Sequence, residues 1–136
     1  IALTAGRRDW LSTRWCNAPK GCLMTEQPIV ENLITTVIPV HNRPKMLRRA
    51  VDSVLAQTWP SCEIIISDDG STDSTSEVGR GLQATYPEIV RYIRHENRGP
   101  GPARESGRLL ARGEFIQYLD SDDLLLPEKF ELQIDA

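Results

Sequence analysis

The sequence lacks a long apolar run, an excess of positive charge and a pattern of paired cysteines. No stretch approaches the roughly 20 apolar residues that a membrane span needs. The net charge of −3 gives no electrostatic reason to expect a nucleic-acid partner. Cys16, Cys22 and Cys62 are an odd number without zinc-site spacing, which predicts free thiols in a reducing compartment, with a Cys16–Cys22 bridge as the alternative. We therefore expect a cytoplasmic protein, either free or peripheral to the cytoplasmic face of a membrane.

The first 32 residues differ in pattern from the rest of the chain. Residues 1–23 carry four basic residues against one acidic residue, and they show neither a helical nor a strand period. They also lack the continuous apolar core of a secretory signal. We expect residues 1–32 to be an extension outside the folded domain, with translation starting naturally at Met24; an Arg-rich targeting segment is the alternative. Residues 33–136 suffice for one domain with one core.

Strand and helix patterns alternate from Leu33 onward. Short β-branched or apolar runs predict strands at residues 33–38, 62–67, 89–93 and 115–119. Apolar residues at helical spacing predict helices at residues 44–58, 74–86, 103–112 and from 127 onward. Residues 97–102 have the composition of a loop, and Ser74 with Glu77 has the spacing of a capping box. The alternation is typical of βαβ units, so we predict an α/β fold with a mostly parallel sheet that is covered on both faces.

Polar side chains follow each of the four predicted strands. They are, in chain order, His41 with Asn42, Asp68 with Asp69, Asn97 with Arg98, and Asp120 with Asp122 and Asp123. Parallel strands end at one edge of a sheet, and ligands bind at that edge near a switch in strand order. We therefore expect one ligand site that these side chains surround.

The acidic turn at residues 120–123 carries the strongest chemical signal. Like charges this close repel one another, so they require water or a cation. Mg²⁺ and Mn²⁺ take oxygen ligands, and Mg²⁺ is typically held by one or two carboxylates together with ligand phosphates. The turn therefore predicts a divalent cation that bridges a diphosphate and assists a leaving group. The alternative is an acidic loop that caps the next helix.

Other residues at this edge suit further parts of such a ligand. The amides of Gly99 and Gly101, with Arg104 at a helix start, could meet negative charge. Asp69 could accept a hydrogen bond from the N–H of a nucleobase, whereas Asp68 fits a tight turn and a helix cap. His41 has no nearby nucleophile and fits ring stacking or a loop surface.

Five ordered motifs resemble family 2 glycosyltransferases of the GT-A fold. They are VIPVHN at 37–42, SVLAQT at 53–58, EIIISDDGSTD at 63–73, the pattern from Asn97-Arg98-Gly99 to Phe115 that includes Ala103-Arg104 and Gly107, and DSDD at 120–123. The resemblance covers about residues 33–136. It implies a Rossmann-like GT-A sheet that binds a nucleotide sugar, present here as the N-terminal, donor-binding portion of a longer enzyme.

Matched position by position, the resemblance implies a nucleoside pocket. Pro39 and His41 would line the base, Asp69 would contact the uracil, and Asp120 would lie beside the ribose. His41 stands where the family usually has tyrosine, a change that weakens ring stacking.

The same matching implies where phosphate and metal bind. Arg104 would approach the base or the diphosphate, and Asp122 would ligate Mn²⁺ or Mg²⁺, with Asp123 adjacent. Glu105 stands where the family usually has asparagine, and its carboxylate would repel a diphosphate.

The implied activity is transfer of a sugar from a nucleotide-diphosphate sugar, a UDP-sugar by the uracil contact, with inversion. The acceptor would be a saccharide, lipid or protein, in the synthesis of a polysaccharide or glycoconjugate, and we expect the catalytic base beyond Ala136. A truncated or non-catalytic nucleotide-diphosphate-binding module is the alternative. A nucleotidyltransferase is disfavoured, because residues 39–44 hold no glycine-rich loop with a lysine. A receiver-type domain is disfavoured, because it would need a characteristic lysine late in the chain and would have no glycine loop at 97–101. We also expect self-association through an exposed sheet edge.

Overall fold

Four parallel strands form one sheet in the order β3-β2-β1-β4, in a computed structural model that describes residues 28–135. The elements in chain order are β1 (Val30–Val40), α1 (Pro44–Leu55), β2 (Cys62–Asp69), α2 (Thr75–Thr85), β3 (Val90–His95), α3 (Pro100–Leu110), β4 (Gly113–Tyr118) and α4 (Lys129–Ile134). The predicted α/β fold with a parallel sheet is confirmed. The predictions for Met24 and for a Cys16–Cys22 bridge lie outside the described residues.

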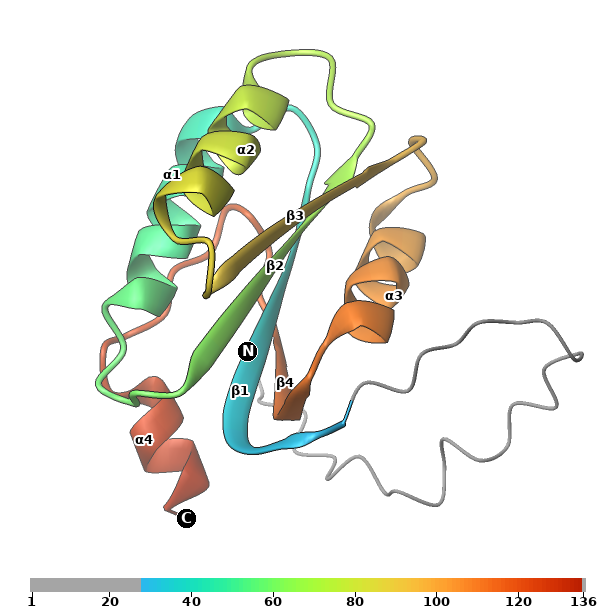
Figure 1. Ribbon diagram of the computed structural model, residues 1–136. Coiled ribbons are helices and arrows are strands. Elements are labelled where there is room, and N and C mark those ends of the chain that lie inside the picture. Colours follow the sequence, from blue (N-terminus) through green and yellow to red (C-terminus); the bar gives the residue numbers. More distant parts are fainter. Residues whose placement is uncertain (1–27, 136) are drawn as a thin grey trace, which may run out of the picture.

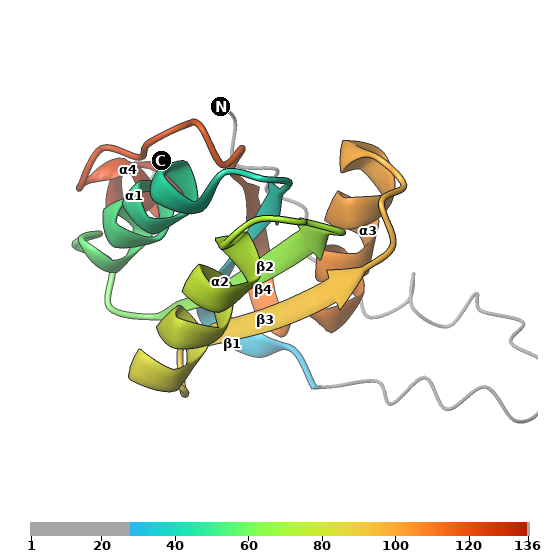
Figure 2. The same cartoon turned by 90° about the horizontal axis from the view of Figure 1, so that it is seen from above.

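Helices cover both faces of the sheet (Figures 1 and 2). α1 and α2 lie side by side on one face, and α3 packs on the other against β1 and β2. The apolar run of β1 supplies both cores by alternation: Ile34 and Ile38 face the α1–α2 side, and Val37 faces the α3 side. All three are fully buried, which is why the strand reads as nearly continuous apolar sequence.

β1 is longer at both ends than the predicted strand. It begins at Val30, inside the predicted extension, and it continues through Pro39 to Val40. The carbonyl of Val37 accepts a hydrogen bond from the amide of Leu119, so Val37 and Pro39 direct their backbone toward β4. β4 ends at Tyr118, which pairs with Val37, so no residue of β4 lies opposite Pro39. Proline has no N–H to donate, and at this position its presence therefore costs the sheet no hydrogen bond.

Two predictions about helix starts are wrong in detail. α3 begins at Pro100, so residues 100–102 are helical; prolines fit a first turn, where amides need no helical partner. Ser74 is the N-cap of α2, as its spacing suggests, but its side chain makes no capping bond. Asp73 accepts instead from the amide of Thr75 at 2.9 Å and from its hydroxyl at 2.5 Å, so the neighbouring carboxylate takes the capping role.

A buried carboxylate on β2 links β1 to the residue before β4, at the end of the sheet opposite the polar strand ends. Glu63, 1% exposed, accepts from the Thr35 hydroxyl at 2.7 Å and from Arg112 through its amide at 3.0 Å and its Nε at 2.7 Å. A Cβ at Gly113 would lie 2.6 Å from the carbonyl oxygen of Leu33, so only glycine fits there. The Arg112-Gly113 pair that contributes to the family resemblance thus has a structural role.

Residues 53–58 hold the segment that follows the acidic turn. The hydroxyl of Ser53 accepts from the amide of Leu125 at 3.2 Å. The side chain of Gln57 donates to the carbonyl of Leu126 at 2.7 Å and accepts from the amide of Phe130 at 3.2 Å. Phe130 is fully buried. The SVLAQT motif therefore fixes the path of the chain from the acidic turn to α4.

Three large apolar side chains near the C-terminal end of the described region are exposed: Leu124, Leu126 and Leu132. β4 also forms one edge of the sheet. These features agree with the expected self-association, which stays a prediction. Within residues 28–135, every helix is too short or too polar to traverse a lipid bilayer.

Candidate functional site

A pocket of about 370 Å³ lies at the carboxyl ends of the strands. β2 and β3 extend the sheet to one side of β1 and β4 to the other, so the pocket lies at the switch in strand order where α/β proteins bind ligands. Its lining residues are Pro39, Val40, His41, Arg43, Asp69, Pro100, Ala103, Arg104, Asp120, Ser121 and Asp122. Among them are all six residues that the family resemblance assigns to nucleotide or metal binding: Pro39, His41, Asp69, Arg104, Asp120 and Asp122.

The acidic turn presents three carboxylates as a cluster at the pocket. Asp120, Asp122 and Asp123 each offer an oxygen, and these oxygens lie within 4.8 Å of one another. Such a set of hard oxygen donors fits Mg²⁺ or Mn²⁺. Asp120 and Asp122 are half exposed, so a ligand can reach them from solvent.

Two arginines lie across from these carboxylates. Arg104 of α3 donates to Asp120 at 2.8 Å, and Arg43, just before α1, lies 3.5 Å from Asp122. Both pairs are partly exposed and contribute little to stability, so their partners can be exchanged at small cost. Arg43 was not singled out from the sequence, although its place directly after His41-Asn42 at a strand end is the signal that could have found it.

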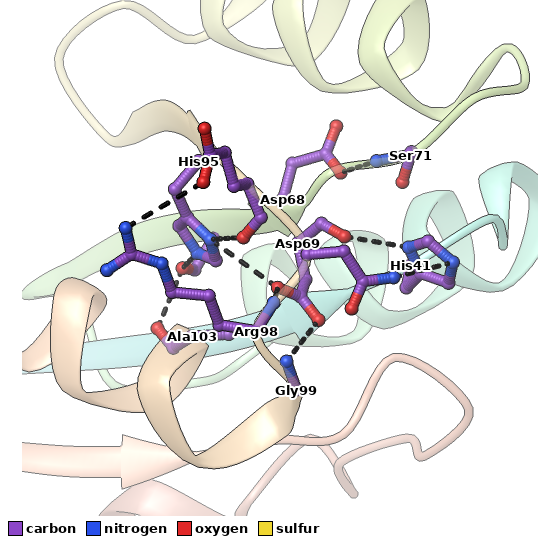
Figure 3. A network of polar contacts seen from close by, with 11 residues as sticks. His41, Asp68, Asp69, Ser71, His95, Arg98, Gly99 and Ala103 are labelled. Carbon is purple, nitrogen blue, oxygen red and sulfur yellow. Dashed lines mark hydrogen bonds and ion pairs between the residues drawn. The ribbon is translucent and has the colours of Figure 1, made fainter.

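Asp69 holds the loop that leads into α3 (Figure 3). Its carboxylate is 5% exposed and accepts from the amides of Arg98 at 2.7 Å and of Gly99 at 3.0 Å. The Gly99 amide therefore points to Asp69, and the expectation that it would meet ligand phosphate is not supported. Each carboxylate oxygen can accept more than one bond, so Asp69 can still receive an N–H from a ligand.

Asp68, the residue before Asp69 in β2, points away from the pocket and stabilises the fold. It is fully buried and accepts from the Ser71 amide at 2.9 Å, the Ser76 hydroxyl at 3.1 Å and the Tyr92 hydroxyl. Burial alone would raise the pKa of Asp68, but these hydrogen bonds together hold the pKa below its ordinary value of 3.8. The expected turn role of Asp68 is therefore confirmed, whereas the cap of α2 comes from Asp73.

The variant Asp68→Asn is expected to lose about 1–3 kcal/mol of unfolding free energy at pH 7, because buried donors lose a charged acceptor. The folded pKa is depressed, so this contribution is complete above pH 3.8 and disappears as the pH falls through the folded pKa. Urea denaturation at pH 7, 5 and 3 should show that the difference in unfolding free energy between Asp68→Asn and wild type becomes smaller only at pH 3. Asp52→Asn, at an exposed position of α1, is the control. A gap of equal size at all three pH values would contradict the assignment.

Glu105 and Cys62 are not part of the pocket lining. Glu105 pairs with Arg108 on the same helix, at 2.9 Å and 2.5 Å, and this contact engages the carboxylate that was expected to repel a diphosphate. Cys62 forms no disulfide with another described residue, and burial raises the pKa of its thiol to about 11. Its thiolate is therefore scarce near neutral pH, and Cys62 is a poor nucleophile.

Comparisons with known proteins agree with this geometry. The family model described as Glycosyl transferase family 2 matches residues 35–136. Chondroitin synthase of Escherichia coli is 42% identical over 103 residues, which are 76% of this chain and 15% of that protein. The curated relatives that the chain matches are longer: it spans 18% of an uncharacterized glycosyltransferase of Rickettsia felis, to which it is 40% identical over 111 residues.

Solved structures show the same arrangement of strands and helices. S. aureus TarS 1-349 in complex with UDP-GlcNAc aligns with a TM-score of 0.67 and 25% identity, over 76% of this chain and 30% of that one. The mannosyltransferase PcManGT from Pyrobaculum calidifontis, in complex with GDP-Man and Mn²⁺, aligns with a TM-score of 0.63 and 26% identity, over 85% and 34%.

Proposed function

The chain belongs to glycosyl transferase family 2, and we propose that its pocket binds the nucleotide-sugar donor of an inverting, divalent-metal-dependent sugar transfer. Its sheet is the Rossmann-like sheet of GT-A glycosyltransferases. The observation that carries the proposal is the convergence of the six assigned residues on one pocket at the switch in strand order. These residues come from β1 and the turn after it, from β2, from α3 and from the turn after β4, so the fold as a whole brings them together and not one loop.

In the proposed complex, Pro39 and His41 line the base and Asp69 accepts the N–H of a uracil. Asp120 lies beside the ribose, which requires it to exchange its bond from Arg104 for one from a ribose hydroxyl. Arg104 is then available for the base or the diphosphate. A UDP-sugar is the proposed donor, and the UDP-GlcNAc and GDP-Man complexes of the two aligned structures support a nucleotide sugar in general.

Asp122 is the proposed metal ligand, with Asp120 and Asp123 close enough to assist. A bound Mn²⁺ or Mg²⁺ would neutralise the diphosphate and stabilise it as a leaving group. A cation on Asp122 would weaken its pair with Arg43, 3.5 Å away, and would leave the positive charge of Arg43 available to the same diphosphate. The arginine thus keeps positive charge at the pocket whether Asp122 is engaged by metal or not.

The acceptor, a saccharide, lipid or protein, and the base that activates it belong to the proposal and not to the described site. Such a base must lie within hydrogen-bond reach of the acceptor hydroxyl. The cytoplasmic location expected from free cysteines likewise stays a prediction. Binding without turnover is the outcome expected of a nucleotide-diphosphate-binding module.

The test is a thermal-unfolding titration of the 136-residue chain with UDP and with GDP, each with and without Mn²⁺. Ligand that binds only the folded form adds RT ln(1 + [L]/Kd), about 2.7 kcal/mol at 100 times Kd. We expect a UDP-dependent rise in Tm that requires Mn²⁺. A rise in Tm with GDP but not with UDP would show that the pocket prefers guanine to uracil. If neither nucleotide raises the Tm of a folded sample, the proposal is refuted.

A further inference from the structure

Asp69 lies between the two histidines of the chain, His41 and His95 (Figure 3). His41 follows β1, and His95 is the last residue of β3, where its backbone pairs with Asp69 in the sheet. No role was expected for His95 from the sequence. The partners of the two rings differ, and those partners determine where each ring carries its protons.

His41 meets one acceptor and two donors. Its Nδ1 lies 2.7 Å from the carbonyl oxygen of Asp69, which can only accept, so Nδ1 carries hydrogen. Its Nε2 lies 3.3 Å and 3.4 Å from the amide nitrogens of Asn42 and Asn97. The Asn42 side chain is oriented by the amide of Thr72, which donates to its oxygen at 2.8 Å, so its nitrogen faces the ring. These contacts place hydrogen on Nδ1 of His41 and leave its Nε2 as an acceptor.

The Nδ1 of His95 meets acceptors only. It lies 2.9 Å from the carbonyl oxygen of Glu96 and 3.5 Å from Oδ1 of Asp69. A carbonyl cannot donate, so Nδ1 must carry hydrogen in every protonation state of the ring. The ring is one-fifth exposed and does not line the pocket itself; it lies behind Asp69, which does.

The Nε2 of His95 faces the hydroxyl of Ser67, which can either donate a hydrogen bond to this nitrogen or accept one from it. Ser67 Oγ lies 3.1 Å from this nitrogen and 2.7 Å from the carbonyl oxygen of Ala103 in α3. The hydroxyl has one hydrogen. When Ser67 donates to Ala103, its oxygen can accept from a protonated Nε2, and the ring is positively charged. When Ser67 donates to Nε2, the ring is neutral.

We propose that His95 is a positioning residue for the donor site, held with hydrogen on Nδ1 facing Asp69, and that proton uptake at Nε2 strengthens donor binding. The proposal rests on the proposed function. The charged ring lies beside the carboxylate of Asp69, which orders residues 98 and 99, and it places positive charge next to a residue that lines the pocket for an anionic diphosphate. The charged groups around it are Asp69 from β2, and Glu96 and Arg98, which lie 3.9 Å apart and are exposed; α3 contributes the Ala103 carbonyl.

The first test needs no ligand. Nitrogen-15 NMR of the imidazoles in the 136-residue chain reads each nitrogen separately, and with two histidines the His41→Gln variant assigns both rings. We expect the Nδ1 of His95 to carry hydrogen at every pH between 5 and 8, so that any change with pH appears at Nε2. A neutral ring with its hydrogen on Nε2, the form that an unconstrained histidine favours in water, would overturn the proposal.

The second test measures Kd for UDP-GlcNAc and for GDP-mannose with Mn²⁺ between pH 5.5 and 8. The diphosphate of a nucleotide sugar is esterified at both ends and does not titrate in this range, so a pH dependence belongs to the protein or its metal. We expect wild type to bind up to about fivefold more tightly at pH 5.5 than at pH 8, the effect of one partly exposed charge pair.

Two variants separate positioning from structural support. His95→Asn places an amide N–H near the position of Nδ1, and we expect wild-type affinity at pH 8 without the gain at low pH. His95→Gln places its amide near Nε2 instead, and we expect several-fold weaker binding at all pH values. Equal pH dependence in His95→Asn and wild type would overturn the proposal. If wild type binds neither nucleotide sugar, the proposed function fails, and the NMR result alone decides the state of His95.

Discussion

Replacing Glu63 by alanine is expected to lower the unfolding free energy by about 2–4 kcal/mol. The Thr35 hydroxyl and the Arg112 amide would lose their shared acceptor in the interior, and Arg112 would also lose its charged partner at 2.7 Å. Arg91, 3.8 Å from the carboxylate, adds a weaker term because it is about one-third exposed. Urea denaturation at pH 7 measures the loss.

The matched controls for Glu63→Ala are Glu63→Gln and Glu88→Ala. Glutamine keeps the length and one oxygen, so it should lose less than alanine, whereas Glu88 is exposed in a turn and should change stability by less than about 0.5 kcal/mol. Because Glu63 lies at the opposite end of the sheet from the pocket, the Kd for nucleotide of the folded variant should equal that of wild type. A Glu63→Ala variant as stable as wild type would show that the contacts of Glu63 carry no net stability.

Replacing Asp122 by alanine is expected to remove the metal-dependent part of nucleotide binding. At a nucleotide concentration of 100 times Kd, wild type should gain about 2.7 kcal/mol, which is a rise in Tm of about 10 °C for a domain of this size. The variant should keep the wild-type Tm without ligand, because Asp122 is half exposed and its pair with Arg43 contributes about 1 kcal/mol at most. Thermal unfolding with and without Mn²⁺ measures both quantities.

Asp52→Ala serves as the control for Asp122→Ala, since Asp52 is an exposed aspartate on α1 outside the pocket lining. It should retain the full metal-dependent rise in Tm. Retention of that rise in Asp122→Ala would assign the cation to Asp120 or Asp123, and loss of the rise in both variants would point to a general effect of charge.

Local pattern was sufficient for the strands and for the residues at their ends. The predicted strands at 62–67 and 115–119 are followed directly by Asp68-Asp69 and by Asp120, and parallel strands must end at one edge, so the pocket follows from sequence and topology together. Where two local signals competed, the prediction failed. Asp73 took the capping bond expected of Ser74, and Pro100 began a helix within a stretch whose composition is typical of loops.

Residues whose role depends on a partner far along the chain could not be found in this way. Arg43 acquires its role from Asp122, His95 from Ser67 and Asp69, and Glu63 from Arg112. Each is an ordinary charged or polar residue in its own segment. The pairing of β2 with β3 brings His95 to its partners, and the pairing of β1 with β2 and β4 brings the other partners together.

The strand order has a consequence for how the chain is made. β1, β2 and β3 can pair as soon as they have been synthesised, but the other edge of β1 stays unpaired until residues 113–118 arrive. At about 5–20 residues per second, that interval is on the order of a second or more. During it, the most apolar strand of the sheet has an open edge, which is the kind of surface that chaperones protect and that neighbouring nascent chains can join.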